Sequence, residues 1–300
     1  MKSRTIEDIV TEAKRLVESG VKEIVLVSQD STAYGTDIYK RRALADLLRE
    51  VADKSGAPWI RLMYAYPTEM DEEMLDVISK KENIVKYIDI PLQHASAKVL
   101  KLMRRPPTVR DTVELIKKKL PGCTIRTTFV VGFPGETEED FNELYNFVKE
   151  SRFDRVGVFT YSKEKGTPAF DFENQVPEEI KQERRDKIMK LQQKISLEKN
   201  QAFIGKQLDM LIEYVEHDVE THHSVPQRIV GRSFRDAPEI DGQLYIDLDV
   251  IPAKAGIQTK GTSRDSSGFR VKPGMTIQPG EFIKVKVIAC DEYDLFCELM

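Results

Sequence analysis

Residues 126–141 read RTTFVVGFPGETEEDF. The first half is short, apolar and β-branched and stops at Gly132, which is typical of a buried strand. A helix is predicted from Thr137, because Thr137 with Asp140 resembles a capping box and apolar residues then recur at helical spacing. Residues 132–136 form a tight turn at the carboxyl end of a strand, where parallel α/β folds bind ligands. An ordinary strand-to-helix turn remains the alternative for this segment alone.

The same alternation of strand and helix runs outward from this segment through residues 1–176. Such a rhythm favours a parallel sheet with right-handed crossovers. Five strand–helix units are too few to close an eight-stranded barrel, so we expect an open, partial TIM-like barrel. The five strands are predicted at residues 23–28, 59–63, 85–90, 126–131 and 155–161.

Polar side chains follow these strands in the loops at their carboxyl ends. A cluster of polar residues at one edge of a sheet is typical of a ligand site. Any single one of these residues could equally be an ordinary surface-loop residue, because surface loops are usually polar. Arg104 and Arg105 could hold a ligand carboxylate, or they could form a solvated helix end. The loop candidates are Gln29, Asp30, Tyr64, Glu69, Gln93, His94, Glu136, Tyr161 and Ser162.

A different kind of domain follows the predicted partial barrel. Residues 177–204 form a long linker helix with one apolar stripe. In residues 205–300 helical periodicity ceases, and five short antiparallel strands are expected to form a small oligonucleotide-binding-like barrel. Residues 251–276 have no periodicity and are predicted to be an inserted, mobile loop. His217, His222 and His223 are interpreted as surface residues.

Composition and charge limit the classes of function. The formal net charge is −4, so general attraction to nucleic acid or anionic membrane is not expected. No apolar run approaches the roughly 20 residues of a membrane span and no signal-peptide core is present, which predicts a cytoplasmic protein. From residue 205 onward, 11 Lys and Arg face 16 Asp and Glu. An acidic barrel of this kind is better suited to bind a basic protein than RNA.

The loops taken together resemble the radical S-adenosylmethionine (SAM) methylthiotransferases, and the carboxyl domain resembles the TRAM domain of those enzymes. A further stretch, GRSFRDAPEIDG at residues 231–242, resembles the branch that modifies an aspartate of small-subunit ribosomal protein number twelve. The branch that modifies tRNA carries a different sequence there. The resemblance rests on SQD at 28–30 with YG at 34–35, PLQHAS at 91–96 with VLKLMRR at 99–105, VGFPGET at 131–137, and YS at 161–162 with GTP at 166–168.

The resemblance implies a mechanism and a set of binding residues. A reduced 4Fe-4S cluster would cleave SAM, the adenosyl radical would take a hydrogen from the β-carbon of the aspartate, and a methylthio group would be installed with a second SAM as methyl donor. Gln29 and Gln93 would bond the ribose or methionine part, and Arg104 would face the methionine carboxylate. The adenine would contact Gly132, Phe133, Pro134, Gly135 and Glu136, and lie against Phe159 to Tyr161.

One departure from the family is severe, because its Cys-x-x-x-Cys-x-x-Cys motif is absent. The three cysteines, Cys123, Cys290 and Cys297, have no metal-site spacing, so no metal ligand and no catalytic residue is assigned. The resemblance implies two 4Fe-4S clusters in the full-length protein, and the ligands of both are expected outside this chain. The chain is therefore interpreted as a fragment that starts mid-protein and is inactive alone.

Three alternatives to this function remain at the level of the sequence. One is a tRNA-modifying methylthiotransferase of the same family, and another is a non-catalytic RNA-binding module. The third is a TIM-like aldolase or phosphate-handling enzyme. That reading is disfavoured by the lack of a Gly-rich phosphate loop in the late strands and of an evident catalytic lysine.

Overall fold

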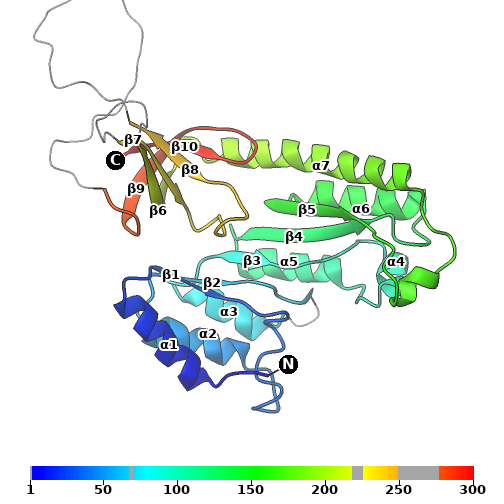
Figure 1. Cartoon of the computed structure of the whole chain (residues 1–300), viewed down its shortest axis with the longest axis horizontal. Coiled ribbons are helices and arrows are strands. Elements are labelled where there is room, and N and C mark those ends of the chain that lie inside the picture. Colours follow the sequence, from blue (N-terminus) through cyan, green and yellow to red (C-terminus); the bar gives the residue numbers. More distant parts are fainter. Residues whose placement is uncertain (1, 68–69, 218–225, 249–276) are drawn as a thin grey trace, which may run out of the picture. The chain divides into compact units, whose positions relative to one another are not determined.

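The computed structural model (Figure 1) describes residues 2–67, 70–217, 226–248 and 277–300. The chain divides into two units, Met1–Ser196 and Leu197–Met300. The division falls inside the predicted linker helix. Glu69, His222, His223 and the predicted inserted loop 251–276 lie outside the described residues.

The first unit contains five parallel strands in chain order, as the alternating pattern predicts. One ladder joins β1 to β2, and a second joins β3, β4 and β5. A parallel bridge between Ile60 and Ile84 links the two ladders. The described strands thus form an open parallel sheet, and the expected partial barrel is confirmed. The strands are β1 (Glu23–Leu26), β2 (Trp59–Leu62), β3 (Tyr87–Asp89), β4 (Thr124–Val131) and β5 (Arg155–Thr160).

Helices connect the strands (Figure 1), and apolar side chains from the helices and the strands share one hydrophobic core. Their amino-termini follow sequence signals; in α3, for example, the side chain of Asp71 accepts a hydrogen bond from the backbone N–H of Met74. The helices are α1 (Ile6–Glu18), α2 (Leu44–Lys54), α3 (Glu72–Lys80), α4 (Ala97–Leu102), α5 (Val109–Lys119), α6 (Glu138–Ser151) and α7 (Glu178–Gln201), with the short 3-10 helix η2 (Pro168–Asp171) before α7.

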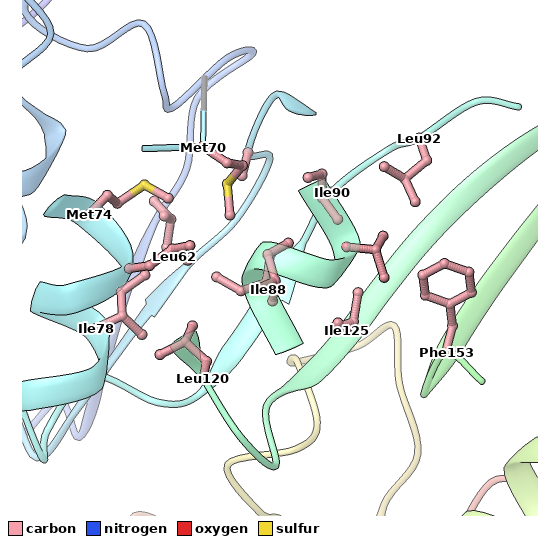
Figure 2. Close-up of a cluster of buried hydrophobic side chains, with 14 of the residues drawn as sticks. Leu62, Met70, Met74, Ile78, Ile88, Ile90, Leu92, Leu120, Ile125 and Phe153 are labelled. Carbon is pink, nitrogen blue, oxygen red and sulfur yellow. The ribbon is translucent and has the colours of Figure 1, made fainter. Parts of the chain in front are cut away.

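The hydrophobic core of this unit lies between the strands and the helices. Figure 2 shows Ile88 of β3 and Ile125 of β4 pointing into it beside Leu120 and Phe153. Burying each such side chain stabilises the fold by about 1.5–3 kcal/mol. Because strand side chains alternate, their sequence neighbours point to the other side. We call that side of β1–β5 the helix-free face.

The second unit is a closed barrel with strand order β10-β8-β7-β6-β9. The five strands expected from the sequence are confirmed, but the pairing is not wholly antiparallel, because β8 and β10 run parallel. The strand pattern alone could not show this, since the order of strands around a barrel is set by tertiary packing. The strands are β6 (Gln207–His217), β7 (Pro226–Arg232), β8 (Leu244–Asp247), β9 (Phe282–Cys290) and β10 (Leu295–Leu299).

Within the described residues, no helix is both long enough and apolar enough to cross a membrane.

Candidate functional site

The turn after β4 is fixed by its own glutamate. The backbone N–H groups of Gly132 and Phe133 donate to Oε2 of Glu136 at 2.7 and 3.3 Å. The N–H of Glu136 donates back to the carbonyl of Phe133 at 2.9 Å. The predicted capping box of Thr137 and Asp140 is present and starts α6 directly after this turn. The Glu136 side chain therefore lies beneath the turn.

A buried arginine pairs with this glutamate from α7, and a buried histidine lies beside it. Nη1 of Arg184, on α7, lies 2.8 Å from Oε1 of Glu136, and the two side chains are 7% and 0% exposed. His94, in the loop after β3, places Nε2 3.6 Å from Oε2 of Glu136. Nδ1 of His94 accepts from the N–H of Ser96 at 2.9 Å, so neutral His94 carries its proton on Nε2, facing the carboxylate. Three segments thus meet at one carboxyl group.

Lys181 of α7 holds the ends of β4 and β5 together. Its Nζ donates to the carbonyl of Tyr161 at 3.0 Å. Gly132 has φ +73°, and a Cβ at this position would overlap the side-chain methylenes of Lys181. Glycine is required here for both reasons. Lys181 and Arg184 are one helical turn apart, so the first turns of α7 contact the segments that follow both β4 and β5.

A cavity of about 300 Å³ opens beside this turn, at the carboxyl ends of the strands. It brings together four residues predicted from the sequence: Gln93, Arg104, Phe133 and Tyr161. The remaining lining residues are Leu102, Met103, Arg105, Val130, Thr167, Pro168, Ala169 and Phe172.

The cavity has apolar walls and a few polar groups. The ring of Phe133 meets Tyr161 edge-on at 5.1 Å and Phe172 at 6.2 Å. Gln93 is held at the edge of β4, because its N–H donates to Thr128 and its carbonyl accepts from Val130, both at 2.8 Å. Flat apolar walls with a few placed polar groups are typical of small-molecule sites.

Two of the polar groups are available to a ligand. The hydroxyl of Tyr161 is buried and has no hydrogen-bond partner within the described part of the chain. Burial, helped by the charge of Glu164, raises the pKa of Tyr161, so the hydroxyl keeps its proton and can donate. Arg104 is exposed at the cavity wall with φ +55°. These groups could bind a ligand that has both an aromatic ring and a carboxylate.

The other predicted residues lie around the cavity or away from it. Pro134, Gly135 and Glu136 line a neighbouring hollow of about 770 Å³. Gln29 is exposed in the loop after β1, and Phe159 is 62% exposed on β5. Neither of them lines these two cavities.

Two basic residues of α7, Lys181 and Arg184, were not predicted as site residues, because the helix was interpreted only as a linker. The available signal was weak: two basic residues three positions apart, on a helix that is charged on most sides. The short helix η2, whose Pro168 and Ala169 line the cavity, was not predicted either.

The described residues provide no site for an iron–sulfur cluster. They contain no group of three His, Cys, Asp or Glu side chains that could hold a metal ion. Cys123 belongs to the first unit, while Cys290 and Cys297 lie on the barrel. Burial raises the pKa of Cys297 to about 12, with a further contribution from Asp236, so this thiol keeps its proton at neutral pH.

Comparison with known proteins shows which families the two parts of the chain match. Residues 1–148 match the radical SAM superfamily, and residues 204–300 match the TRAM domain. The chain therefore contains a radical SAM domain and a TRAM domain. Strands β1 to β4 lie within the radical SAM match, and the closed barrel lies within the TRAM match.

Several proteins named as ribosomal protein methylthiotransferases are similar to most or all of this chain. The ribosomal protein uS12 methylthiotransferase RimO of Acetivibrio thermocellus is 42% identical over 100% of the chain and 60% of its own length. RimO of a Thermoanaerobacter species is 48% identical over 83% of the chain and 55% of its own. The chain spans about three fifths of the length of these relatives.

One solved structure with a similar sheet is coproporphyrinogen III oxidase (HemN) from Escherichia coli, described as a radical SAM enzyme. It is 19% identical with a TM-score of 0.42, over 63% of this chain and 46% of its own.

Proposed function

We propose that this chain is the SAM-binding and substrate-binding part of a methylthiotransferase that adds a methylthio group to the β-carbon of an aspartate in ribosomal protein uS12. The observation that carries the proposal is the cavity at the ends of β3, β4 and β5, where Gln93, Arg104, Phe133 and Tyr161 meet. The RimO relatives named above support the choice of substrate.

The cavity residues have distinct tasks in this proposal. The adenine of SAM lies against Phe133 and Val130, and the Tyr161 hydroxyl donates a hydrogen bond to it. The Gln93 amide bonds the ribose. The Arg104 guanidinium pairs with the methionine carboxylate, which suits its planar fork of donors. Buried apolar walls exclude water from the bound nucleoside.

The 4Fe-4S cluster of the complete enzyme would supply the electron that cleaves SAM. The residues described here do not fit such a group, so we assign no step to it in this chain. We expect two clusters in the complete enzyme, both held by residues other than the three cysteines of this chain.

The acidic TRAM barrel provides a docking surface for a basic partner. From residue 205 onward, Asp and Glu outnumber Lys and Arg by 16 to 11, whereas proteins that bind RNA strongly are usually basic. This charge favours the basic ribosomal protein over tRNA. Titrating the chain with uS12 and with tRNA distinguishes the two. Binding to uS12 but not to tRNA supports the proposal, whereas tRNA binding that falls steeply with salt contradicts it.

SAM binding tests the cavity directly. Calorimetric titration with SAM is expected to show binding that Arg104→Gln and Tyr161→Phe each weaken by about tenfold, the size of one lost hydrogen bond to a charged or buried group. Arg110→Gln, on the exposed side of α5, is the control and should bind as the unchanged chain does. Equal affinity in all four proteins would show that SAM binds elsewhere.

The activity needs a polypeptide as long as the RimO relatives. After reconstitution with iron and sulfide, such a protein should show visible cluster absorbance, form 5′-deoxyadenosine from SAM, and add the mass of one methylthio group to uS12. Absence of cluster absorbance would contradict the enzyme assignment.

A further inference from the structure

Each of the five parallel strands carries one charged residue, and all five lie on the helix-free face. Their sequence neighbours Ile24, Ile60, Ile88, Ile125 and Val156 pack in the core on the other side. Three are arginines and two are carboxylates, so this face is net positive in a chain of net charge −4. The five are Glu23, Arg61, Asp89, Arg126 and Arg155.

Two of the arginines differ in their accessibility. Nε of Arg61 lies 2.7 Å from Oε1 of Glu23; Arg61 is fully buried and stacks over the Tyr87 ring at 4.6 Å. Nη1 of Arg126 lies 2.9 Å from Oδ1 of Asp89, yet the Arg126 side chain is 25% exposed. The first pair is closed to a ligand, whereas the second keeps part of a guanidinium within reach.

The surroundings of Arg126 hold it in place and add positive charge. Asp89 is only 3% exposed, and its Oδ2 accepts from the N–H of Tyr64 at 3.3 Å. The carboxylate is therefore fixed, and it fixes the guanidinium. Arg155 lies directly opposite Arg126 in the register of β4 and β5. An anionic group that approaches this point meets two neighbouring cations.

The same face of β4 connects Arg126 with the cavity. Arg126, Thr128 and Val130 occupy every second position of β4, so they share this face, and Val130 lines the cavity. Arg126 and Val130 are four positions apart along the strand, or about 13 Å. The exposed ring of Phe159 pairs in register with Val130 and offers an apolar surface beside this path. A carboxylate at Arg126 therefore belongs to a second ligand, beyond the nucleoside in the cavity.

We propose that Arg126 binds the carboxylate of the substrate aspartate, with Asp89 as the positioning residue that orients the guanidinium. This inference rests on the proposed function and makes Arg126 the residue that selects an acidic side chain for modification. A guanidinium matches a carboxylate through two parallel hydrogen bonds, and an asparagine amide offers only one acceptor oxygen.

Peptide binding tests this assignment with the chain as it is. Fluorescence anisotropy, with SAM present, would compare a labelled basic peptide with one central aspartate and its asparagine twin. We expect the unchanged chain to bind the aspartate peptide about tenfold more tightly. Arg126→Gln should remove this preference, and Arg126→Lys should keep part of it. Because Arg126→Gln leaves the buried Asp89 without this partner, the double variant Asp89→Asn/Arg126→Gln removes both charges together.

The controls separate Arg126 from the cavity. Arg104→Gln should weaken SAM binding and leave the ratio of the two peptide affinities unchanged, and Arg110→Gln should change neither. An aspartate preference that persists in the double variant overturns the inference. So does a preference lost in Arg104→Gln, which would place the carboxylate in the cavity, and so does equal or absent binding of the two peptides by the unchanged chain. Measurements of SAM binding and of SAM cleavage test the proposed function separately from this inference.

Discussion

Arg184 stabilises the turn after β4 without lining either cavity. Its partner Glu136 is fully buried, and its other partner, Glu138, is 58% exposed at 3.2 Å. Since Glu136 also receives the N–H groups of Gly132 and Phe133, the position of the cavity wall depends on a charge supplied by α7. Breaking a buried ion pair from one side costs more than the pair contributes, because a carboxylate is left in a dry environment.

Arg184→Met should therefore lower the free energy of unfolding by about 3–5 kcal/mol. Urea unfolding followed by circular dichroism measures this loss, and SAM affinity should fall with it. The double variant Arg184→Met/Glu136→Gln should recover much of the stability, because no unpaired charge remains. Arg185→Met, at an exposed position on the same helix, should change stability by less than about 0.5 kcal/mol. A loss in Arg185→Met as large as that in Arg184→Met would refute this explanation.

Gly132 and Gly122 flank β4 and provide a matched pair of substitutions. Both have positive φ, +73° and +76°, so alanine is strained by about 1 kcal/mol at each. A Cβ at Gly122 meets nothing within 4 Å, whereas one at Gly132 overlaps Lys181. Gly132→Ala should thus cost about 1–3 kcal/mol more than Gly122→Ala in urea unfolding. Equal losses would mean that Lys181 moves aside freely and does not hold the turn.

At the scale of elements, the start of α6 is tied to the loop after β3. Ser96 donates to Oδ1 of Asp140 at 2.7 Å, and Nζ of Lys98 lies 2.6 Å from Oδ2. The N–H of Thr137 donates to the same oxygen at 2.9 Å. Burial alone would raise the pKa of Asp140, but the hydrogen bonds from Lys98, Thr137 and Ser96 outweigh it and hold this pKa well below its usual value of 3.8.

This lowered pKa predicts a dependence of stability on pH. The ionised Asp140 stabilises the fold fully above the unfolded-state pKa, and the contribution is lost as pH falls toward the lower folded-state pKa. Asp140→Asn should cost about 1–2 kcal/mol at neutral pH, and the difference from the unchanged chain should shrink below about pH 4. Urea titrations from neutral pH to about pH 3 measure it. A difference that stays constant over this range would contradict the assignment.

Helices and strands could be predicted where short sequence patterns determine them. The side-chain contacts between distant segments could not. The strand before Gly132 and the capping box at Thr137 follow from residue types at short spacing, and the structure contains both. The meeting of His94, Glu136 and Arg184 joins residues up to 90 positions apart in the sequence. No short-range pattern encodes such a meeting, because it depends on how α7 packs. The cavity was predicted in part, since strand ends converge in parallel sheets, but side-chain directions such as that of Gln29 were not.

The first part of the stretch at residues 231–242 is mostly buried and packs within the barrel unit. Ser233, Arg235 and Asp236 are each at most 2% exposed, and the Ser233 hydroxyl donates to Oδ2 of Asp236 at 2.7 Å. A Cβ at Gly242 would overlap the backbone of Tyr293. These contacts explain why particular residue types are needed here. They fix the shape of the barrel, while its acidic surface carries the charge proposed to attract a partner.

At the scale of the whole molecule, each unit has a hydrophobic core of its own. The end of α7 and the turn that follows it both contact the barrel unit. Phe203 packs against the barrel core, and the guanidinium of Arg235 lies 3.8 Å above the Phe203 ring. Nη2 of Arg235 also donates to Oδ1 of Asn200 at 3.2 Å, and Nδ2 of Asn200 donates to the carbonyl of Asp291 at 3.0 Å. The folding unit that contains the barrel therefore begins before its first strand.

Two fragments test this boundary. The fragment Leu197–Met300 should unfold cooperatively in urea. A fragment from Lys206 to Met300 lacks Asn200 and Phe203, so the buried Arg235 loses a stacking partner and a hydrogen bond, and stability should fall by roughly 2–4 kcal/mol. Phe203→Leu in the longer fragment keeps apolar packing and removes only the stacking, so its loss should be intermediate. Equal stability of the two fragments would show that α7 contributes nothing to the barrel, and that a TRAM barrel can be cut from its helix at Lys206 without cost.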